Sequence, residues 1–286
     1  MWDRVEKRIG SPAINRLSNS TVAVIGLGSL GSQTAVLMAM SGVGKFILID
    51  PDILEDHNVV RHAGDLRYLG QPKVEVVRNL IKNRNPQIQI ETRRKDALEC
   101  SEVLAQSDLV IVAGLGSEIS QQQIGQTLRN LQKSTLFGCV YERAVAGEVL
   151  FVDRESGPCY SCFASLLRPL QPAHEMGGQE IVYGLEPEEV KAEPGLGLHV
   201  FRVAVVLSDW AIRYLIDDPD ILPPFPGNLV ILSNEEYEVG QNHQGVPIVI
   251  SPSSSWWTKI PKQADCLICG LTEVTTNQSI DELLEV

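Results

Sequence analysis

The sequence predicts an α/β fold with a doubly wound, mostly parallel sheet that continues into an antiparallel extension near the carboxyl end. Short β-branched runs alternate with stretches of helical apolar spacing up to residue 139, the order that βαβ units produce. Over residues 229–250 the apolar runs are short and follow one another without helices, as antiparallel strands do. A chain of 286 residues with 44% hydrophobic content suffices for one large core. We therefore expect one domain over residues 1–271, followed by a polar tail over residues 272–286.

The first βαβ unit begins with the β-branched run at residues 21–25 and closes with the apolar run at residues 45–50. Between these runs lie Gly26, Gly28 and Gly31, followed by an apolar stretch at residues 33–40 that we expect to be helical. A strand, a tight glycine turn, a helix and a parallel strand form the repeating unit of Rossmann-like sheets.

The glycine turn predicts a phosphate-binding site. Unpaired backbone N–H groups and the helix dipole favour phosphate oxygens at such a helix start. Asp50 ends the second strand, 19 residues after Gly31, where a carboxylate accepts hydrogen bonds from ribose hydroxyls. A lone aspartate at a strand end also suits a structural role, so the prediction depends on the whole unit.

The remaining elements continue the pattern. We expect further strands at residues 88–92, 108–113, 134–139, 148–153, 229–232, 237–239 and 246–250, and helices at residues 73–83, 119–131 and 199–216. The Pro- and Gly-rich stretch at residues 169–197 is expected to be a long, mobile loop.

Four of the six cysteines form two CxxC pairs, Cys159 with Cys162 and Cys266 with Cys269. Two such pairs suffice for a tetrahedral Zn²⁺ site without an open position, so the metal would be structural. A redox dithiol is the alternative, but it needs only one pair and usually a thioredoxin-like unit. Of the other two cysteines, Cys139 is most simply a small buried residue.

Charge and hydropathy exclude several partners and locations. The formal net charge of -12 argues against general affinity for nucleic acid or an anionic membrane. The sequence has no apolar run of the roughly 20 residues that span a bilayer. Its start lacks the apolar stretch of a signal peptide. We therefore expect a cytoplasmic protein with reduced thiols.

Taken together, the motifs resemble the ThiF/MoeB/HesA family and the adenylation domain of ubiquitin-activating enzymes, across roughly residues 1–271. The matching stretches are residues 21–32, 50–52, 57–62, 70–73, 157–162 and 266–270. The resemblance implies that ATP with Mg²⁺ is used to couple AMP to the C-terminal carboxylate of a ubiquitin-like or sulfur-carrier protein ending in Gly-Gly.

The resemblance also implies roles for individual residues. Asp50 would bind the ribose, while Asp52 would organise the nucleotide or its metal. Asn58, Arg61 and Lys73 match family residues that hold the triphosphate, with Arg61 and Lys73 supplying catalytic positive charge. The alternatives are that Asn58 caps a helix and that Arg61 or Lys73 lies on a solvated face.

An arginine near the start of the chain usually reaches the ATP of the partner in a homodimer. Arg4 is the candidate for this catalytic role, and Arg8 is the substitute.

Two departures from the family pattern bear on activity. No cysteine lies between Cys162 and Cys266, so a thioester at the usual mobile position is excluded. The aspartate that often holds Mg²⁺ after the strand at residues 108–113 is missing, which leaves Asp52 or Glu118 for the metal. A non-catalytic scaffold is therefore the alternative function, and an NAD-dependent oxidoreductase is a weaker third.

A partner surface is also expected. Val145, Leu150, Phe151 and residues 229–232 would line a sheet face that receives the protein substrate, with the loop at 169–197 covering its tail. The alternative is that this sheet packs on the helix at 199–216. Trp256 and Trp257 suit either an exposed contact patch or a plug in the core or dimer interface.

Overall fold

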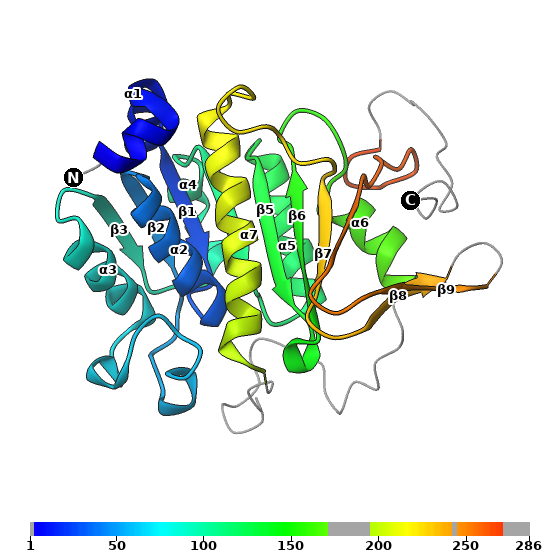
Figure 1. Cartoon of the computed structure of the whole chain (residues 1–286), viewed down its shortest axis with the longest axis horizontal. Helices are drawn as coiled ribbons and strands as arrows, with labels where there is room; N and C mark the ends of the chain where they lie inside the picture. Colours follow the sequence, from blue (N-terminus) through cyan, green and yellow to red (C-terminus); the bar gives the residue numbers. More distant parts are fainter. Residues whose placement is uncertain (1–2, 171–194, 242–244, 271–286) are drawn as a thin grey trace.

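The computed structural model describes residues 3–170, 195–241 and 245–270, and an eight-stranded sheet runs through its centre in the order β10-β7-β6-β5-β4-β1-β2-β3 (Figure 1). The strands are β1 (Thr21–Ile25), β2 (Lys45–Ile49), β3 (Gln89–Arg93), β4 (Leu109–Ala113), β5 (Thr135–Val140), β6 (Ala146–Val152), β7 (Leu229–Ser233) and β10 (Ser255–Thr258). A separate two-stranded sheet pairs β8 (Tyr237–Gln241) with β9 (Pro247–Ile250).

The five strands from β3 to β5 are parallel, whereas β6, β7 and β10 add antiparallel pairs at one side. The doubly wound, mostly parallel sheet with an antiparallel extension is therefore confirmed. The chain moves from β1 outward to β2 and β3 and then returns to β4 on the other side of β1. In sheets of this kind, ligands bind at the carboxyl ends of the strands where the order reverses, which in this sheet is between β1 and β4.

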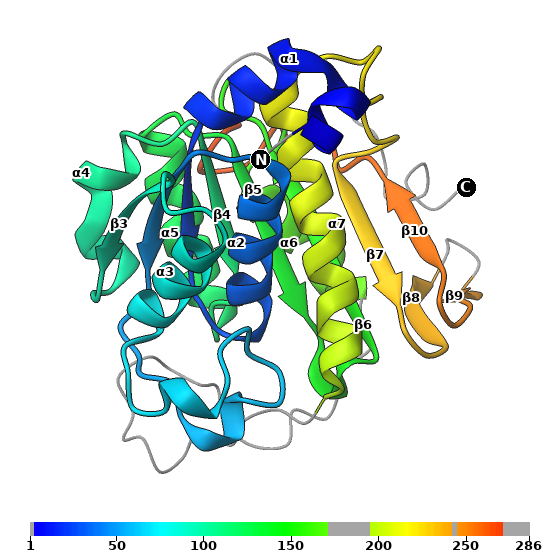
Figure 2. The ribbon, with the colours of Figure 1, turned by 60° about the vertical axis from the view of Figure 1, so that its left-hand side comes forward.

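Helices cover both faces of the sheet (Figure 2). One face packs against α1 (Asp3–Asn19), α2 (Ser29–Ser41), α3 (Lys73–Arg84) and α7 (Gly197–Ile216). The other face packs against α4 (Ser101–Leu104), α5 (Glu118–Asn130) and α6 (Tyr160–Leu167). β1 and β4 are buried on both sides, which explains their almost continuous apolar sequences.

The structure differs from the sequence predictions in several elements. It adds α1, α4 and α6 to the predicted helices and β10 to the predicted strands, and α2 begins at Ser29 rather than at residue 33. α1 escapes the periodicity because it is two helical pieces joined at Gly10, with Pro12 just beyond the kink.

The predicted partner surface on the sheet is wrong. Leu150 and residues 229–232 are buried, with at most 3% of any of them exposed. α7 packs on β5 and β6, which is the alternative arrangement. The side chains of β7 alternate between the cores on the two faces of the sheet and leave no face of this strand for a partner. The part of the proposed covering loop at residues 171–194 lies outside the described residues.

The tryptophan pair belongs to the core edge and not to a contact patch. Trp256 and Trp257 lie in β10, the outermost antiparallel strand, and both are partly buried. The ring of Trp257 stacks on Phe225 with a centroid distance of 4.6 Å and lies 5.6 Å from the ring of Trp210.

Among the described residues, no helix combines the length and the apolar character needed to cross a bilayer.

Candidate functional site

The glycine turn after β1 has the geometry of a phosphate loop. Gly26 adopts φ +80°, a conformation that side chains disfavour. A Cβ on Gly31 would lie 1.8 Å from the carbonyl oxygen of Gly26, so only glycine allows α2 to begin this close to the turn. Gly28 is the N-cap of α2 and no side chain caps it. The first amides of α2 therefore have no partner within the helix and suit an anion.

Asp50 fastens this loop to the neighbouring strand. Its side chain is 4% exposed, and Oδ2 accepts a hydrogen bond from the backbone N–H of Leu27 at 2.6 Å. Oδ1 accepts one from the N–H of Asp52 at 2.8 Å. Burial raises the pKa of Asp50, while the nearby positive charge of Lys73 acts in the opposite direction. Asp50 thus organises the loop in addition to any contact with a ribose.

Lys73 and Asp52 form the charged pair of the site. The Nζ atom of Lys73 lies 2.8 Å from Oδ2 of Asp52, and the backbone N–H of Lys73 donates to the carbonyl of Asp52 at 2.9 Å. The lysine side chain is 11% exposed and the aspartate side chain 54%. The start of α3 therefore holds a mostly covered cation beside the loop, with a carboxylate on its solvent side.

A cavity of about 240 Å³ opens beside the glycine loop at the carboxyl ends of β1 and β2. Gly26 and Asp50 line one side, and α5 with the segment before it lines the other. The lining residues are Ile25, Gly26, Ile49, Asp50, Pro51, Lys95, Asp96, Ala97, Leu98, Leu115, Ser120, Gln123 and Ile124. The apolar members suit a flat ring system and Asp50 suits a polyol. This position matches the reversal point between β1 and β4.

Asn58 and Arg61 follow on the segment between β2 and α3. Asn58 ends the short helix η1 (Asp56–Asn58), and its Oδ1 accepts from the N–H of Glu55 at 3.1 Å. This is the structural capping role that competes with a functional one, and it leaves the side-chain amide of Asn58 able to donate. Arg61 is half-buried beside the start of α7, where a Cβ on Gly197 would lie 3.7 Å from its Cα.

Arg4 lies at the opposite end of the molecule from the glycine loop. It is an exposed residue of α1, which sits at the amino-terminal end of the sheet (Figures 1 and 2). The length of α7 measures the distance between the site and α1. The first residue of α7 lies near Arg61, and the carbonyl of its last residue, Ile216, accepts a hydrogen bond from Arg16 of α1. Its 20 residues span about 30 Å. Arg4 therefore does not join the site of its own chain.

Glu118, the alternative Mg²⁺ ligand, is already engaged. Its Oε2 lies 3.0 Å from Nε of Arg168 and accepts from the hydroxyl of Tyr160 at 3.1 Å. Arg168 also makes a two-pronged contact, at 3.0 and 2.6 Å, with Glu148, whose side chain is 4% exposed. No sequence signal points to Arg168, because its partners lie 50 and 20 residues away.

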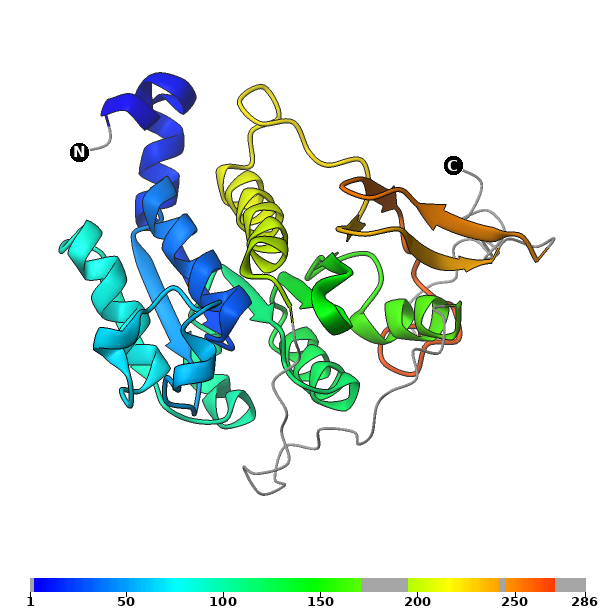
Figure 3. The same ribbon diagram turned by 60° about the horizontal axis from the view of Figure 1, so that its bottom comes forward.

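The four predicted cysteine ligands come together at the far side of the antiparallel extension, where the segment at residues 260–270 lies beside α6 (Figure 3). Their sulfur atoms all lie within 4.8 Å of one another. Three separations are 3.9 Å for Cys159–Cys162, 3.6 Å for Cys159–Cys266 and 3.3 Å for Cys162–Cys269. A tetrahedral ion with metal–sulfur bonds of about 2.3 Å requires about 3.8 Å.

Acid–base properties of the cluster favour a cation. The hydrogen bond from Cys162 lowers the pKa of Cys159 to about 5, whereas burial raises the pKa of Cys269 to about 11. Cysteine binds a metal ion as the thiolate, so a metal bound here would displace the protons of the four thiols. Cys139 differs, since burial raises the pKa of its thiol to about 12 and makes it a poor nucleophile.

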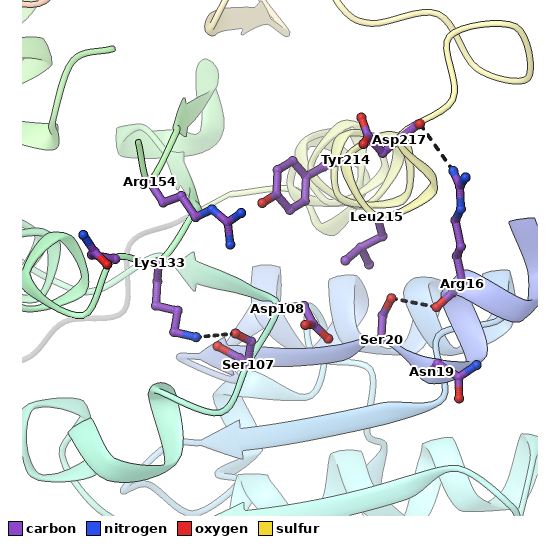
Figure 4. Close-up of a pocket in the computed structure, with 11 residues that line it drawn as sticks. Arg16, Asn19, Ser20, Ser107, Asp108, Lys133, Arg154, Tyr214, Leu215 and Asp217 are labelled. Carbon is purple, nitrogen blue, oxygen red and sulfur yellow. Dashed lines mark hydrogen bonds between the residues drawn. The ribbon is translucent and has the colours of Figure 1, made fainter. Parts of the chain in front are cut away.

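A larger cavity, of about 520 Å³, lies elsewhere, beside the end of α7 (Figure 4). Arg154 and Lys133 extend towards it, and Nζ of Lys133 donates to the carbonyl of Ser107 at 2.7 Å. Asp108, directly before β4, also lines it. This is the amino-terminal edge of the sheet, opposite the glycine loop, so size alone does not make it the nucleotide site.

Comparison with known proteins now assigns the family. The ThiF family profile matches residues 3–244. The chain belongs to the ThiF family. It is 30% identical over 281 residues to the SAMP-activating enzyme E1 of Haloferax volcanii, which covers 96% of this chain and 88% of that protein. This ThiF-family chain is also 40% identical, over 90 residues only, to the tRNA threonylcarbamoyladenosine dehydratase of Bacillus subtilis, covering 31% and 35% of the two chains.

Other relatives of this ThiF-family member are more distant. The ubiquitin-like modifier-activating enzyme 5 of Xenopus laevis is 26% identical over 165 residues, which are 53% of this chain and 42% of that protein. The chain thus spans less than half of the length of two of these three relatives. The crystal structure of E. coli MccB with AMPCPP and MccA superimposes with a TM-score of 0.69 at 15% identity, covering 94% of this chain and 73% of that chain, a likeness of fold.

Proposed function

We propose that this protein uses ATP to activate the C-terminal carboxylate of a ubiquitin-like or sulfur-carrier protein as an acyl-adenylate. The observation that carries the proposal is the convergence of the glycine loop, Asp50 and the Lys73–Asp52 pair at the reversal point of a ThiF-family sheet. The printed names of the relatives, a SAMP-activating enzyme and a ubiquitin-like modifier-activating enzyme, support this substrate class.

In the proposed reaction, a carboxylate oxygen of the partner attacks the α-phosphorus of ATP. A new oxygen–phosphorus bond forms, the bond to the β-phosphate oxygen breaks, and pyrophosphate leaves with its electron pair. The residues Lys73 and Arg61 neutralise the charge that resists the approach of two anions, and the amides after Gly28 hold phosphate oxygens. Catalysis is positioning and electrostatic stabilisation, and it needs no protein nucleophile.

Mg²⁺, when bound with the triphosphate, supplies further charge neutralisation. Of the two candidate ligands, Asp52 fits better, because its half-exposed carboxylate keeps a solvent side beyond its contact with Lys73, whereas Glu118 is held by Arg168 and Tyr160. A single carboxylate suits an ion that usually retains several waters.

Zn²⁺ is the proposed resident metal of the cysteine cluster. Sulfur separations of 3.3 to 3.9 Å fit the about 3.8 Å edge of a tetrahedral zinc–thiolate site. Its role is structural, since Cys159, Cys162, Cys266 and Cys269 fill all positions and join α6 to the end of the described chain.

A homodimer completes the proposed enzyme. Arg4 lies outside the site of its own chain, and we propose that it reaches the ATP of the partner protomer. Since residues 163–265 contain no cysteine, the acyl-adenylate passes to a separate acceptor without a thioester in that segment.

ATP–pyrophosphate exchange tests the proposal. The zinc-loaded protein is assayed with ubiquitin-like and sulfur-carrier proteins encoded by the same genome, each also prepared without its terminal Gly-Gly. We expect exchange with one intact partner and none with its shortened form. Exchange that persists after truncation contradicts the assigned substrate.

A non-catalytic scaffold is the second candidate. The engagement of Glu118 with Arg168 favours it, because this carboxylate at the start of α5 is then not free to hold Mg²⁺. A scaffold shows no exchange with any partner and still binds the partner protein in a pull-down with purified components.

A further inference from the structure

We propose that His62 is a positioning residue that fixes the glycine loop in its phosphate-binding shape. This inference rests on the proposed ATP site. It assigns a role to His62, the last residue of the matching stretch at residues 57–62, which had none so far.

The peptide groups around Leu27 are held from two sides. Its N–H donates to Oδ2 of Asp50 at 2.6 Å, and its carbonyl oxygen lies 2.9 Å from Nε2 of His62. Leu27 stands between Gly26 and Gly28, the two glycines that make the turn. Asp50 begins the segment that leaves β2, and His62 lies 12 residues further along it. This one segment therefore holds the loop from two sides and also carries other residues of the site.

The second ring nitrogen determines which tautomer His62 adopts. Nδ1 accepts a hydrogen bond from the backbone N–H of Gly64 at 2.8 Å, so it carries no proton. Nε2 therefore carries the proton and donates it to the carbonyl of Leu27. A Cβ on Gly64 would lie 3.1 Å from Nδ1 and 2.5 Å from a methyl of Val76, so glycine permits this close approach.

Burial keeps the ring in this state. His62 is 6% exposed, and burial lowers its pKa from 6.5 to about 4, with the charge of Lys73 acting in the same direction. The imidazole is therefore neutral near pH 7, and both of its nitrogen atoms are satisfied.

Loss of the bond to Leu27 frees the loop on one side. The carbonyl of Leu27 then lacks a partner in a buried place, and the turn moves to recover one. The amides that follow Gly28 lose their common orientation, which weakens phosphate binding in the ground state and in the transition state alike. Such a change raises the KM for ATP and leaves kcat nearly unchanged.

A pair of amide variants separates the two hydrogen bonds. In His62→Gln the side chain is long enough to donate to the Leu27 carbonyl, whereas in His62→Asn it reaches only the Gly64 N–H. His57→Gln is the matched control, because His57 is a half-exposed histidine of the same segment that contacts Glu55 and Asp56.

We expect the KM for ATP in pyrophosphate exchange to rise about tenfold or more in His62→Asn, to stay within about threefold in His62→Gln, and to stay unchanged in His57→Gln. Hydrogen exchange of the amides of residues 26–31 in the nucleotide-free protein should be faster in His62→Asn than in the other two variants. Equal KM values and equal exchange rates in the Asn and Gln variants overturn the inference.

The two proposals fail separately. If the wild-type protein binds no ATP, the proposed function fails, and hydrogen exchange in the nucleotide-free variants still decides whether His62 holds the loop.

Discussion

Lys73→Met removes the covered cation of the site while retaining most of the side-chain volume. The lysine side chain is 11% exposed and its Nζ lies 2.8 Å from Asp52. A unit charge at about 4 Å from a phosphate oxygen contributes about 4 kcal/mol at an effective dielectric constant of about 20. Removal of one such electrostatic contact typically costs about 2.7–4 kcal/mol, so kcat/KM for ATP should fall by about 10²–10³.

The same substitution should affect stability little. Asp52 is 54% exposed, so solvent screens the pair and its contribution to the free energy of unfolding is about 0–1 kcal/mol. Lys82→Met is the matched control, because Lys82 lies at the other end of α3 and donates to the carbonyl of Pro86. Pyrophosphate exchange gives kcat/KM and urea denaturation gives stability. A Lys73→Met protein that is folded and within about threefold of wild-type kcat/KM refutes the assignment.

Three buried groups lead to further predictions. Cys162→Ser should lose the bound zinc, as measured by elemental analysis, whereas Cys100→Ser should retain it; equal zinc contents contradict the four-cysteine site. Arg168→Met leaves the buried Glu148 with the hydroxyl of Tyr141 but without its cationic partner, and it should lower the free energy of unfolding by about 3–5 kcal/mol in urea; a loss below about 1 kcal/mol speaks against a structural ion pair. Because the unfolded chain protonates His62 near pH 6.5 and the folded chain only near pH 4, its contribution to stability is complete above pH 6.5 and is lost as the pH falls towards 4. The wild type should therefore lose about 3 kcal/mol more than His62→Gln over that interval, and identical losses contradict the neutral histidine.

The sequence could predict the parts of the site that depend on local spacing. Gly26 and Gly31 predict the turn because each has a direct steric reason, the positive φ of Gly26 and the close approach of Gly31 to the Gly26 carbonyl. Asp50 follows because a parallel strand must end beside that turn. The cysteine cluster was predictable for a similar reason, since each CxxC presents two sulfur atoms on one turn.

Contacts between distant segments were beyond the sequence. Arg168 meets Glu118 and Glu148 across three elements, and no spacing rule links residues 50 and 20 positions apart. The same limit hid the Leu27–His62 contact, which joins atoms 35 residues apart. The apolar face of β7 was mistaken for a docking surface, because a run of buried residues looks the same in sequence whichever layer covers it.

The most direct test of the ATP site is a crystal structure of the zinc-loaded protein with a non-hydrolysable ATP analogue and Mg²⁺. We expect the phosphates against the amides after Gly28, the ribose beside Asp50, the adenine in the cavity lined by Leu115 and Ile124, and Nζ of Lys73 turned towards phosphate oxygen. An analogue that binds at another place, or that does not bind at millimolar concentration, contradicts the central claim.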